Sequence, residues 1–224
     1  MIHGRRRGRK LRVSQAGLMA GLLPRLRFAV PETGPLDPRT LFPPGIDGVA
    51  LEIGFGGGEH LAAQAAAHPT LGFIGVEIFE TGVAKLLTAI AARGLDNVRI
   101  LIDDARLLLA ALPDSSLDRA YILFPDPWPK LRHRKRRIVS PASLAALSRI
   151  LRDGGELRLA TDDPDYLRAI LADATAEPAL EWLARRPEEW RIRAADWPPT
   201  RYEDKALKAG RKPAFLAFRR RGRK

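Results

Sequence analysis

A stretch in the middle of the chain combines a carboxylate, a flat aromatic ring and a dense run of positive charge. Residues 120–124 are apolar and have the length and the β-branched or aromatic content of a buried strand. They are followed at once by Pro125-Asp126-Pro127-Trp128-Pro129. Three prolines remove three backbone donors and fix φ, so we expect a stiff loop. Six of the eight residues from Lys130 to Arg137 are Lys or Arg. This combination indicates chemistry on a nucleic-acid base.

Two parts of this stretch have an alternative interpretation. Trp128 could stack on a base, or it could wedge the loop against the core. The basic residues Lys130 and 132–137 could contact phosphates, or they could form one solvated face of a helix. Their position directly after the carboxylate loop favours phosphate contacts.

A glycine-rich stretch follows the first expected strand. Four of the five residues from Gly54 to Gly58 are glycine, which lets the backbone approach a ligand at the carboxyl end of a strand. The sixth position of a dinucleotide-binding motif counted from Gly54 is Glu59, whose carboxylate would repel a pyrophosphate at a helix start. A cofactor without phosphates fits better, and S-adenosylmethionine is the common one. The alternative is a tight strand–helix connection.

Acidic residues end the next two strands. Glu77 closes the second strand, 23 residues after Gly54, where an acid can accept hydrogen bonds from both hydroxyls of a bound ribose. Its alternative role is to favour the start of the following helix. Asp103 and Asp104 follow the third strand; one can accept from an adenine amino group, while the other caps a helix. Acids at successive strand ends indicate one adenosine site.

Two further segments contain helix-capping patterns. Asp163 before Pro164 predicts an N-cap with proline at the first helical position, which leaves Asp162 free to face a ligand. Thr200 and Glu203 have the spacing of a capping box at the start of a basic helix that reaches Gly210.

The positive charge is concentrated in three segments. The net charge is +12, and residues 1–27, 130–137 and 201–224 contain 24 of the 38 basic residues but two of the 26 acidic ones. The rest of the chain therefore has 14 basic residues against 24 acidic ones. Clustering of this kind suits a polyanion such as nucleic acid, although Arg-rich termini can also be tails of no specific role.

Composition narrows the class of protein. The 224 residues suffice for one α/β domain, and no apolar run approaches the length of a membrane span. The chain has no cysteine, which excludes disulfides and a thiol nucleophile. C5 methylation of pyrimidines normally requires a cysteine nucleophile, so this reaction is excluded too. The four histidines lack zinc-ligand spacing, so we expect no metal. A cytoplasmic protein is expected, with a mitochondrial presequence at the Arg-rich start as a minor alternative.

Alternation of apolar runs and helical patterns predicts a mostly parallel sheet with helices on both faces. Residues 1–30 are expected to be a flexible basic arm, and residues 31–224 a single domain. A short turn is expected at Pro38–Phe42. The expected strands are 49–53, 72–77, 98–102, 118–124 and 155–160; the expected helices are 58–67, 80–93, 105–111, 141–151 and 164–175. Two later apolar runs, 179–184 and 213–219, could close the sheet as an antiparallel pair.

With these motifs placed, the chain resembles the bacterial tRNA (guanine-N7-)-methyltransferases over roughly residues 49–218. The matching segments are LEIGFGGGEHL at 51–61, GVEIF at 75–79, FPDPWPK with HRKRRI at 124–138, LATDDPDY at 159–166 and TRYEDKAL at 200–207. The glycine loop would fit many methyltransferases, whereas the PDPW-K segment and the T-R-Y-E segment are specific. Pro129 stands where the family often has His, and Gly57-Gly58 where another residue often separates glycines.

The resemblance implies a Rossmann-like seven-strand methyltransferase fold with an antiparallel final strand. It also implies transfer of a methyl group from S-adenosyl-L-methionine to N7 of a guanine in the tRNA variable loop. Asp126 matches the proposed catalytic acid and a cofactor contact. The other implied cofactor contacts are Glu52, Gly54, Gly56, Glu77 and Asp104. The implied substrate contacts are Lys130, Asp162, Thr200, Arg201, Tyr202 and Glu203. The oligomeric state is left open.

Two other functions compete with this interpretation. Asp126-Pro127-Trp128 partly resembles the D-P-P-Y motif of methyltransferases that act on the adenine amino group, but it lacks the second consecutive proline and the tyrosine. The chain could also be a catalytically silent RNA-binding protein. The acids at 52, 77, 104 and 126 argue against that alternative.

Overall fold

The computed structural model describes residue 8 and residues 10–223. The chain divides into two compact units, Met1–Pro113 and Asp114–Lys224, which are described one at a time. The described residues form seven strands, of which the final one, β7, is antiparallel to its neighbours. The expected α/β class, the mostly parallel pairing and the antiparallel final strand are therefore confirmed.

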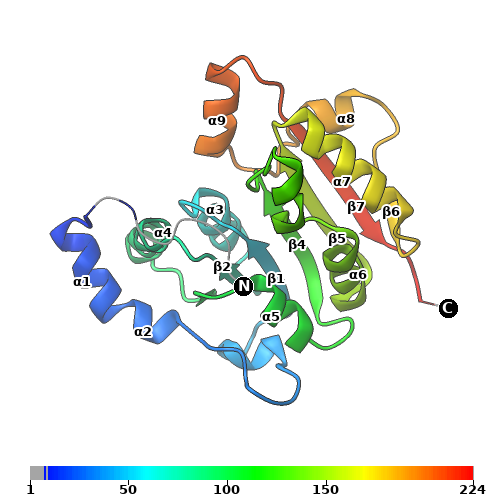
Figure 1. Cartoon of the computed structure of the whole chain (residues 1–224). Coiled ribbons are helices and arrows are strands. Elements are labelled where there is room, and N and C mark those ends of the chain that lie inside the picture. The colour runs from blue at the N-terminus through cyan, green and yellow to red at the C-terminus, as the bar shows by residue number, and fades with distance from the viewer. Residues whose placement is uncertain (1–7, 9, 224) are drawn as a thin grey trace. The chain divides into compact units, whose positions relative to one another are not determined.

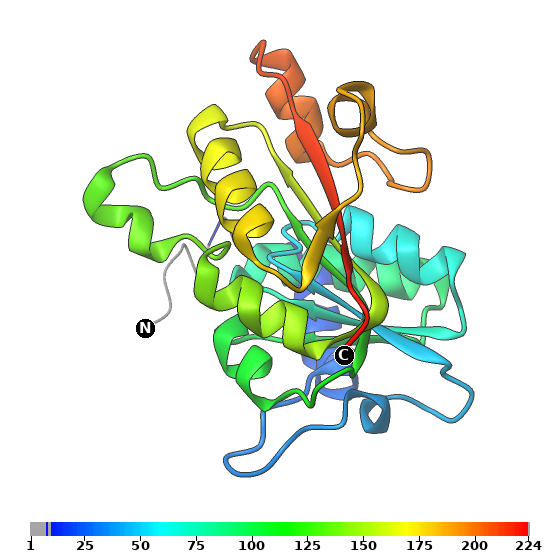
Figure 2. The ribbon, with the colours of Figure 1, turned by 90° about the vertical axis from the view of Figure 1, so that its right-hand side faces the viewer.

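The first unit contains a parallel three-stranded part of the sheet in the order β3-β2-β1. All six residues of β1 are buried, as expected for a parallel strand covered on both faces. In Figure 2, α3 and α5 lie on opposite sides of these strands. The elements in chain order are α1 (Val13–Gly21), α2 (Leu23–Leu26), η1 (Pro38–Leu41), β1 (Gly48–Ile53), α3 (Glu59–Ala67), β2 (Leu71–Val76), α4 (Glu80–Arg93), β3 (Val98–Leu101) and α5 (Ala105–Ala111).

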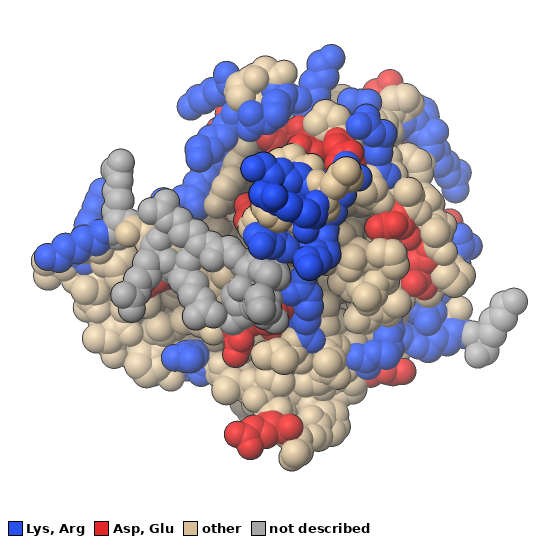
Figure 3. Space-filling model, in the orientation of Figure 1, with Lys and Arg blue, Asp and Glu red and all other residues tan. Residues whose placement is uncertain are grey.

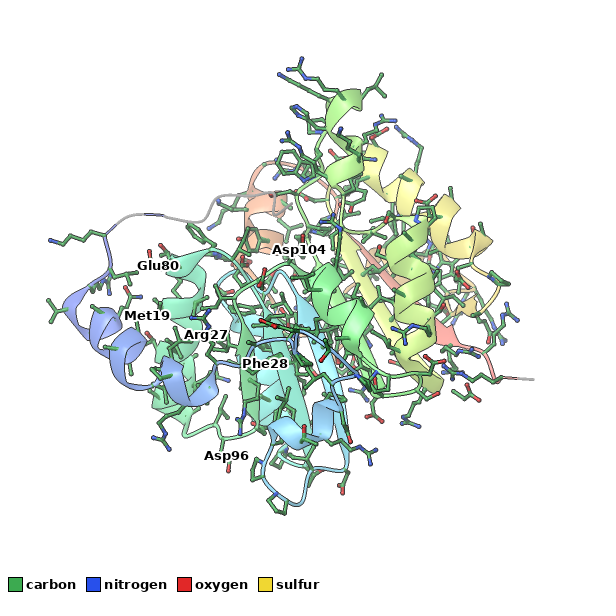
Figure 4. The ribbon with its side chains drawn as sticks, turned by 60° about the horizontal axis from the view of Figure 1, so that its bottom comes forward. Met19, Arg27, Phe28, Glu80, Asp96 and Asp104 are labelled. Atoms are coloured by element: carbon green, nitrogen blue, oxygen red, sulfur yellow. The ribbon has the colours of Figure 1, made fainter. Side chains whose placement is uncertain are left out.

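The start of the chain contains helices that we did not expect. Within the predicted basic arm, residues 13–26 form α1 and α2, and α1 packs against α4 (Figure 1). Arg27 and Phe28 then lie beside β3, where the N–H of Phe28 donates to the carbonyl of Ile100 at 3.2 Å (Figure 4). The arginines at 5, 6, 7 and 9 lie outside the described residues. The flexibility of the arm and the single domain after it stay predictions.

The second unit contains the strand order β4-β5-β7-β6. The later apolar runs form the antiparallel pair that we expected, in which Leu180 lies opposite Arg220. Helices α6 and α7 lie side by side, and α8 packs on β7 from the other side of the strands (Figure 2). The elements are β4 (Leu117–Leu123), η2 (Leu131–Arg136), α6 (Pro141–Ile150), β5 (Leu151–Thr161), α7 (Pro164–Ala176), β6 (Leu180–Trp182), α8 (Glu188–Arg191), α9 (Arg201–Lys208) and β7 (Ala214–Arg220).

Local capping residues explain where several helices begin and end. Asp163 accepts a hydrogen bond from the N–H of Tyr166 at 2.7 Å, and Pro164 opens α7, as predicted. Ser140 caps α6 ahead of Pro141 in the same way. Gly94 ends α4 with a left-handed φ of 63°. Strand β5 begins four residues earlier than expected, at Leu151, which pairs with Leu117 across a register shift.

A buried amide holds three segments of the first unit together. The side-chain nitrogen of Asn97 donates to the carbonyls of Ala65, His68 and Leu71 at 3.0–3.1 Å, and the residue is 2% exposed. Asn97→Ala would leave these buried carbonyls without a partner, so we expect the free energy of unfolding in urea to fall by about 2 kcal/mol. The exposed neighbour Asp96 provides the control, since Asp96→Ala should change it by less than about 0.5 kcal/mol. Equal losses in the two variants would contradict this role of Asn97.

Candidate functional site

The glycine loop after β1 takes conformations that favour glycine. Gly54, Gly56 and Gly58 have φ values of 73°, 57° and 77°, in the left-handed region that side chains with a Cβ rarely enter. The N–H of Gly54 donates to the carbonyl of Val76 at 2.8 Å, so the loop stays next to the end of β2. The density of glycines in this loop therefore has a conformational cause.

The carboxylate of Glu77 holds the glycine loop and the start of α4 at once. One oxygen accepts from the N–H of Gly56 at 2.8 Å, and the other accepts from the N–H groups of Ile78 and Phe79 at 2.8 and 3.0 Å. Three backbone donors point at this half-buried carboxylate, and each ionised oxygen can accept more than one bond. Glu77 therefore organises the loop, which is compatible with its predicted contact to a ribose.

Gly82, which we did not predict, allows α4 to approach the same loop. A Cβ built at Gly82 would lie 2.1 Å from the carbonyl oxygen of Gly56, well inside van der Waals contact. Glycine in the first turn of a helix is unfavourable compared with alanine. A glycine in the turn Glu80-Thr81-Gly82 is therefore the sequence feature that could have indicated this close approach.

Three more of the predicted acids in the first unit, Glu52, Asp103 and Asp104, bind side chains or backbone N–H groups of the chain itself. Glu52 is 3% exposed and its oxygen lies 2.7 Å from Nδ1 of His60, so it links β1 to α3. Asp104 is the N-cap of α5, accepts from the N–H of Arg106 at 3.0 Å and contacts the guanidinium of Arg106 at 3.2 Å. Asp103 accepts from the N–H of Asp104 at 2.7 Å. Asp104 is thus the helix cap of the two, and its cofactor contact stays a prediction.

The three parallel strands bring these acids to one edge of the first unit. β1, β2 and β3 run in the same direction; Glu77 follows β2 directly, and the Asp103-Asp104 pair begins two residues after the end of β3. Figure 4 shows Asp104 and Asp96 at opposite ends of β3. The carboxylate of Glu59 lies over the loop, since a Cβ at Gly57 would meet it at 2.4 Å. A carboxylate where a phosphate would bind, together with these acids, is compatible with a cofactor that has no phosphate.

In the second unit, the proline-rich loop has a strained backbone on both sides of an exposed carboxylate. Phe124 and Trp128 have φ values of 52° and 43°, which are uncommon for bulky residues. Asp126 between them is exposed. The ring of Trp128 lies under the guanidinium of Arg136 at 5.0 Å and contacts His133 edge-on at 6.0 Å. Trp128 is thus packed on η2, which has no buried residue, and both its predicted contact with the core and its stacking on a base stay predictions.

The basic run divides into exposed residues and residues that are already paired. Arg134 and Arg137 bind the carboxylate of Asp165 at 3.0 and 2.7 Å. Hydrogen bonding from Arg137 is the main cause that lowers the pKa of Asp165, and the charge of Arg134 adds to it. Figure 3 shows blue side chains gathered where η2 lies above β4 in Figure 1. Of the described basic residues here, three are exposed and form no ion pair: Lys130, Arg132 and Lys135.

The arginines near the end of the chain, which the charge count assigned to binding of a polyanion, are paired within the protein. Arg223 binds the carboxylate of Asp153 at 2.5 Å and the carbonyls of Arg149 and Leu151. Arg220 approaches the same carboxylate at 3.4 Å. These arginines join β7 to the start of β5, so they are poor candidates for contacts with a polyanion. The one acid that neutralises them, Asp153, lies some 70 residues before Arg223 in the sequence, which the charge count could not show.

Four of the predicted substrate residues lie at the start of α9, and Asp162 binds an arginine just after that helix. Asp162 is not free: it binds Arg211 at 2.6 Å, just after α9. Thr200 caps α9 by accepting from the N–H of Glu203 at 3.2 Å, which confirms half of the expected capping box. The Glu203 carboxylate lies 3.0 Å from Nε of Arg193. Arg201 donates to the hydroxyl of Tyr202 at 3.1 Å. The substrate contacts of the Thr200–Glu203 segment stay predictions.

Residue 8 and residues 10–223 lack two classes of feature. That part of the chain has no group of three or more His, Cys, Asp or Glu side chains that could hold a metal ion. None of its helices is both long enough and apolar enough to cross a membrane.

Known proteins resemble this chain over nearly its whole length. A family model described as a putative methyltransferase matches residues 47–216. A tRNA (guanine-N(7)-)-methyltransferase of Rhodospirillum rubrum is 54% identical over 99% of this chain and 88% of its own length. Its counterpart from Paramagnetospirillum magneticum is 50% identical over 98% and 92%.

Solved structures support the fold. The 16S rRNA methyltransferase KamB superposes with a TM-score of 0.56 at 20% identity, covering 79% of this chain and 89% of its own. An rRNA methylase from Streptococcus thermophilus gives a TM-score of 0.54 at 12% identity, covering 79% and 88%. These two likenesses confirm the Rossmann-like methyltransferase fold, while the sequence relatives identify the family. The chain belongs to the tRNA (guanine-N(7)-)-methyltransferase family.

Proposed function

We propose that this chain transfers the methyl group of S-adenosyl-L-methionine to N7 of a guanine in the variable loop of tRNA. The observation that carries the proposal is the match, over 99% of the chain, to a relative named for this reaction. The exposed Asp126, in its strained loop beside unpaired basic residues, supports it from the structure. A reaction on tRNA would take place in the cytoplasm.

The acceptors of the first unit are suited to hold the cofactor. Glu77 would accept from the ribose hydroxyls and Asp103 or Asp104 from the adenine amino group, while the backbone at Gly54 and Gly56 allows close approach. Glu52, near the end of β1 and bound to His60, would contribute a further carboxylate to the cofactor site. When bound, the cofactor supplies a sulfonium methyl group, which guanine N7 takes with its in-plane lone pair while the electrons of the broken C–S bond return to sulfur.

The chain has little acid–base chemistry to perform. Guanine N7 carries no proton, so no general base is required before attack. Holding the purine in line can then contribute much of the rate, up to roughly 7–11 kcal/mol of the barrier. The proposal therefore assigns the residues of the second unit to positioning and to charge stabilisation.

Asp126 is the residue that we assign to the purine. Its carboxylate would accept hydrogen bonds from guanine N1–H and the exocyclic amino group, and so oppose the positive charge that develops on the ring. Adenine presents no donor at N1, so the same carboxylate would discriminate against it. This is the catalytic role of Asp126; it would also contact the cofactor.

The exposed charges of the second unit would bind the tRNA backbone. Lys130, Arg132 and Lys135 are available for phosphates. Asp162, with the Thr200–Glu203 segment, would contact the substrate from the end of β5 and from α9. Their present ion pairs with Arg211 and Arg193 fix the position of these groups.

The direct test is methyl transfer to unmodified tRNA, followed by chain cleavage at N7-methylguanine to locate the site. We expect one modified guanine, in the variable loop. Methylation of an adenine amino group, detected by mass spectrometry of digested nucleosides, would favour the alternative enzyme class. Retention of tRNA without binding of S-adenosylmethionine in calorimetry would indicate a silent RNA-binding protein.

The approach of α4 to the glycine loop predicts a specific loss of cofactor affinity. In Gly82→Ala, the new Cβ would displace the Gly56 carbonyl, and we expect S-adenosylmethionine to bind about tenfold more weakly in calorimetry. Gly17→Ala in α1 is the matched control, since a Cβ there meets nothing within 4 Å. That change should leave affinity unchanged and slightly stabilise the helix. Unchanged affinity in Gly82→Ala would show that the loop does not bind the cofactor.

The role of Asp126 predicts a loss confined mainly to turnover. Asp126→Asn keeps the size of the side chain but replaces one acceptor with a donor, so we expect kcat to fall by about 100-fold or more. Cofactor affinity should change by only a few-fold. Asp114→Asn, which removes an exposed carboxylate of the same unit, should leave both quantities unchanged. Mild, equal losses in kcat and cofactor affinity would refute the proposed role of Asp126.

The unequal pairing of the basic residues predicts which of them contribute to tRNA affinity. Lys135→Gln should weaken tRNA binding and lower the slope of log affinity against log salt by about one, because one phosphate contact is lost. Arg152→Gln removes an arginine that Asp118 already neutralises at 2.5 Å, so the slope should stay unchanged. Titrations at several salt concentrations distinguish the two variants. If the slope of log affinity against log salt is unchanged in Lys135→Gln as well as in Arg152→Gln, η2 is not part of the tRNA-binding surface.

A further inference from the structure

Arg137 belongs to the basic run by sequence but not by position. Only 7% of its surface is exposed, whereas Arg132, Arg134 and Lys135 of the same run are exposed. Its Nε donates to the carbonyl oxygen of Pro127 at 2.8 Å, and its Nη2 donates to Oδ2 of Asp165 at 2.7 Å. A guanidinium with these partners is not available to a phosphate.

The carbonyl that Arg137 binds belongs to a critical peptide group. It is the peptide between Pro127 and Trp128, directly before the left-handed φ of Trp128. Trp128 also precedes Pro129. The backbone of a residue before proline is restricted to extended conformations more strongly than that of most other residues. Asp126 lies on the other side of Pro127. Fixing this one peptide plane therefore constrains both the indole and the carboxylate.

The position of Arg137 is itself fixed from several sides. Its guanidinium lies over the ring of Tyr166, 4.5 Å from the centroid. The hydroxyl of Tyr166 accepts from the N–H of Val139 at 3.0 Å, and burial raises the pKa of this tyrosine to about 12. Asp165, the next residue to Tyr166, provides the ion pair. Helix α7 thus presents two consecutive side chains that hold Arg137 against the loop.

We propose that Arg137 is a positioning residue that holds the Asp126 loop in its strained conformation by binding the Pro127 carbonyl. The inference rests on the proposed function of Asp126. It differs from a phosphate-binding role because it predicts an effect on turnover in place of tRNA affinity. Lysine cannot replace arginine here, since a single ammonium lacks the planar fork that reaches both oxygens while stacking on a ring.

The kinetic test is a double-mutant cycle in the full chain. Arg137→Lys should lower kcat by about 10- to 100-fold, with the KM for tRNA and the affinity for S-adenosylmethionine within about twofold of the original. In the Asp126→Asn background the same change should lower kcat by less than about twofold, because the group that it positions is already gone. Arg168→Lys is the control: it removes another arginine near Asp165 that does not contact the loop, and it should leave kcat unchanged.

A second measurement does not depend on activity. Each of the four tryptophans gives one indole N–H signal in a ¹⁵N-labelled sample, and Trp128→Phe assigns the signal of Trp128 by its loss. Arg137→Lys should shift or broaden that signal and leave the other three in place, whereas Arg168→Lys should move none. Asp165→Asn, which loosens the guanidinium without removing it, should produce the same shift to a smaller extent.

The outcomes separate the inference from the proposed function. An unchanged Trp128 signal in Arg137→Lys, a rise in the KM for tRNA at constant kcat, or equal losses of kcat in both backgrounds would overturn the positioning role. Movement of all four signals together, with a lower melting temperature, would show general unfolding and would also overturn it. If the original protein methylates no guanine but the selective shift is seen, the proposed function fails while the contact between Arg137 and the loop stands.

Discussion

Loops that contain many glycines or prolines cannot hold themselves in place by backbone pairing, and in this chain charged side chains supply the missing partners. Glu77 accepts from three N–H groups at the glycine loop and the start of α4. Arg137 donates to a carbonyl in the proline-rich loop, which has few N–H groups of its own. Buried or half-buried backbone groups must find partners, and a charged partner binds them more strongly than a neutral one. The conformation of both candidate loops depends on these two side chains.

The same principle changes how the net charge of +12 should be understood. A basic residue contributes to binding of a polyanion only when its charge is neither neutralised nor buried. Arg223 is occupied by Asp153 and two carbonyls, and Arg137 is enclosed by Asp165 and Tyr166. The charge that is available in the second unit is therefore smaller and more localised than the composition indicates. Part of it lies on η2, next to the loop that contains Asp126, and part on the exposed lysines of α9 and the residues after it, Lys205, Lys208 and Lys212.

The sequence predicted elements well where the signal is local. Asp163 with Pro164 and the glycines after β1 fix the limits of neighbouring elements through side-chain caps and φ preferences, so α7 and the glycine loop begin where expected. Helix α1 was missed because none of its residues is buried and its N-cap is an arginine. The partner of Asp162 was missed because Arg211 is 49 residues away. Arg137 could not be told from its basic neighbours, because only the structure shows which of them is buried.

The backbone of Gly56 shows how helices outside the sheet can influence the candidate cofactor site. Its N–H is held by Glu77, and its carbonyl oxygen lies where any side chain at Gly82 would collide with it. The first contact comes from Glu77, just before α4, and the second from the first turn of α4, so both tie the loop to the start of that helix. Helix α1 lies against α4 through exposed and half-buried residues, so it contacts the same helix that contains Gly82. The segment predicted to be a flexible basic arm therefore contains a helix that lies against α4, the helix whose first turn limits the glycine loop.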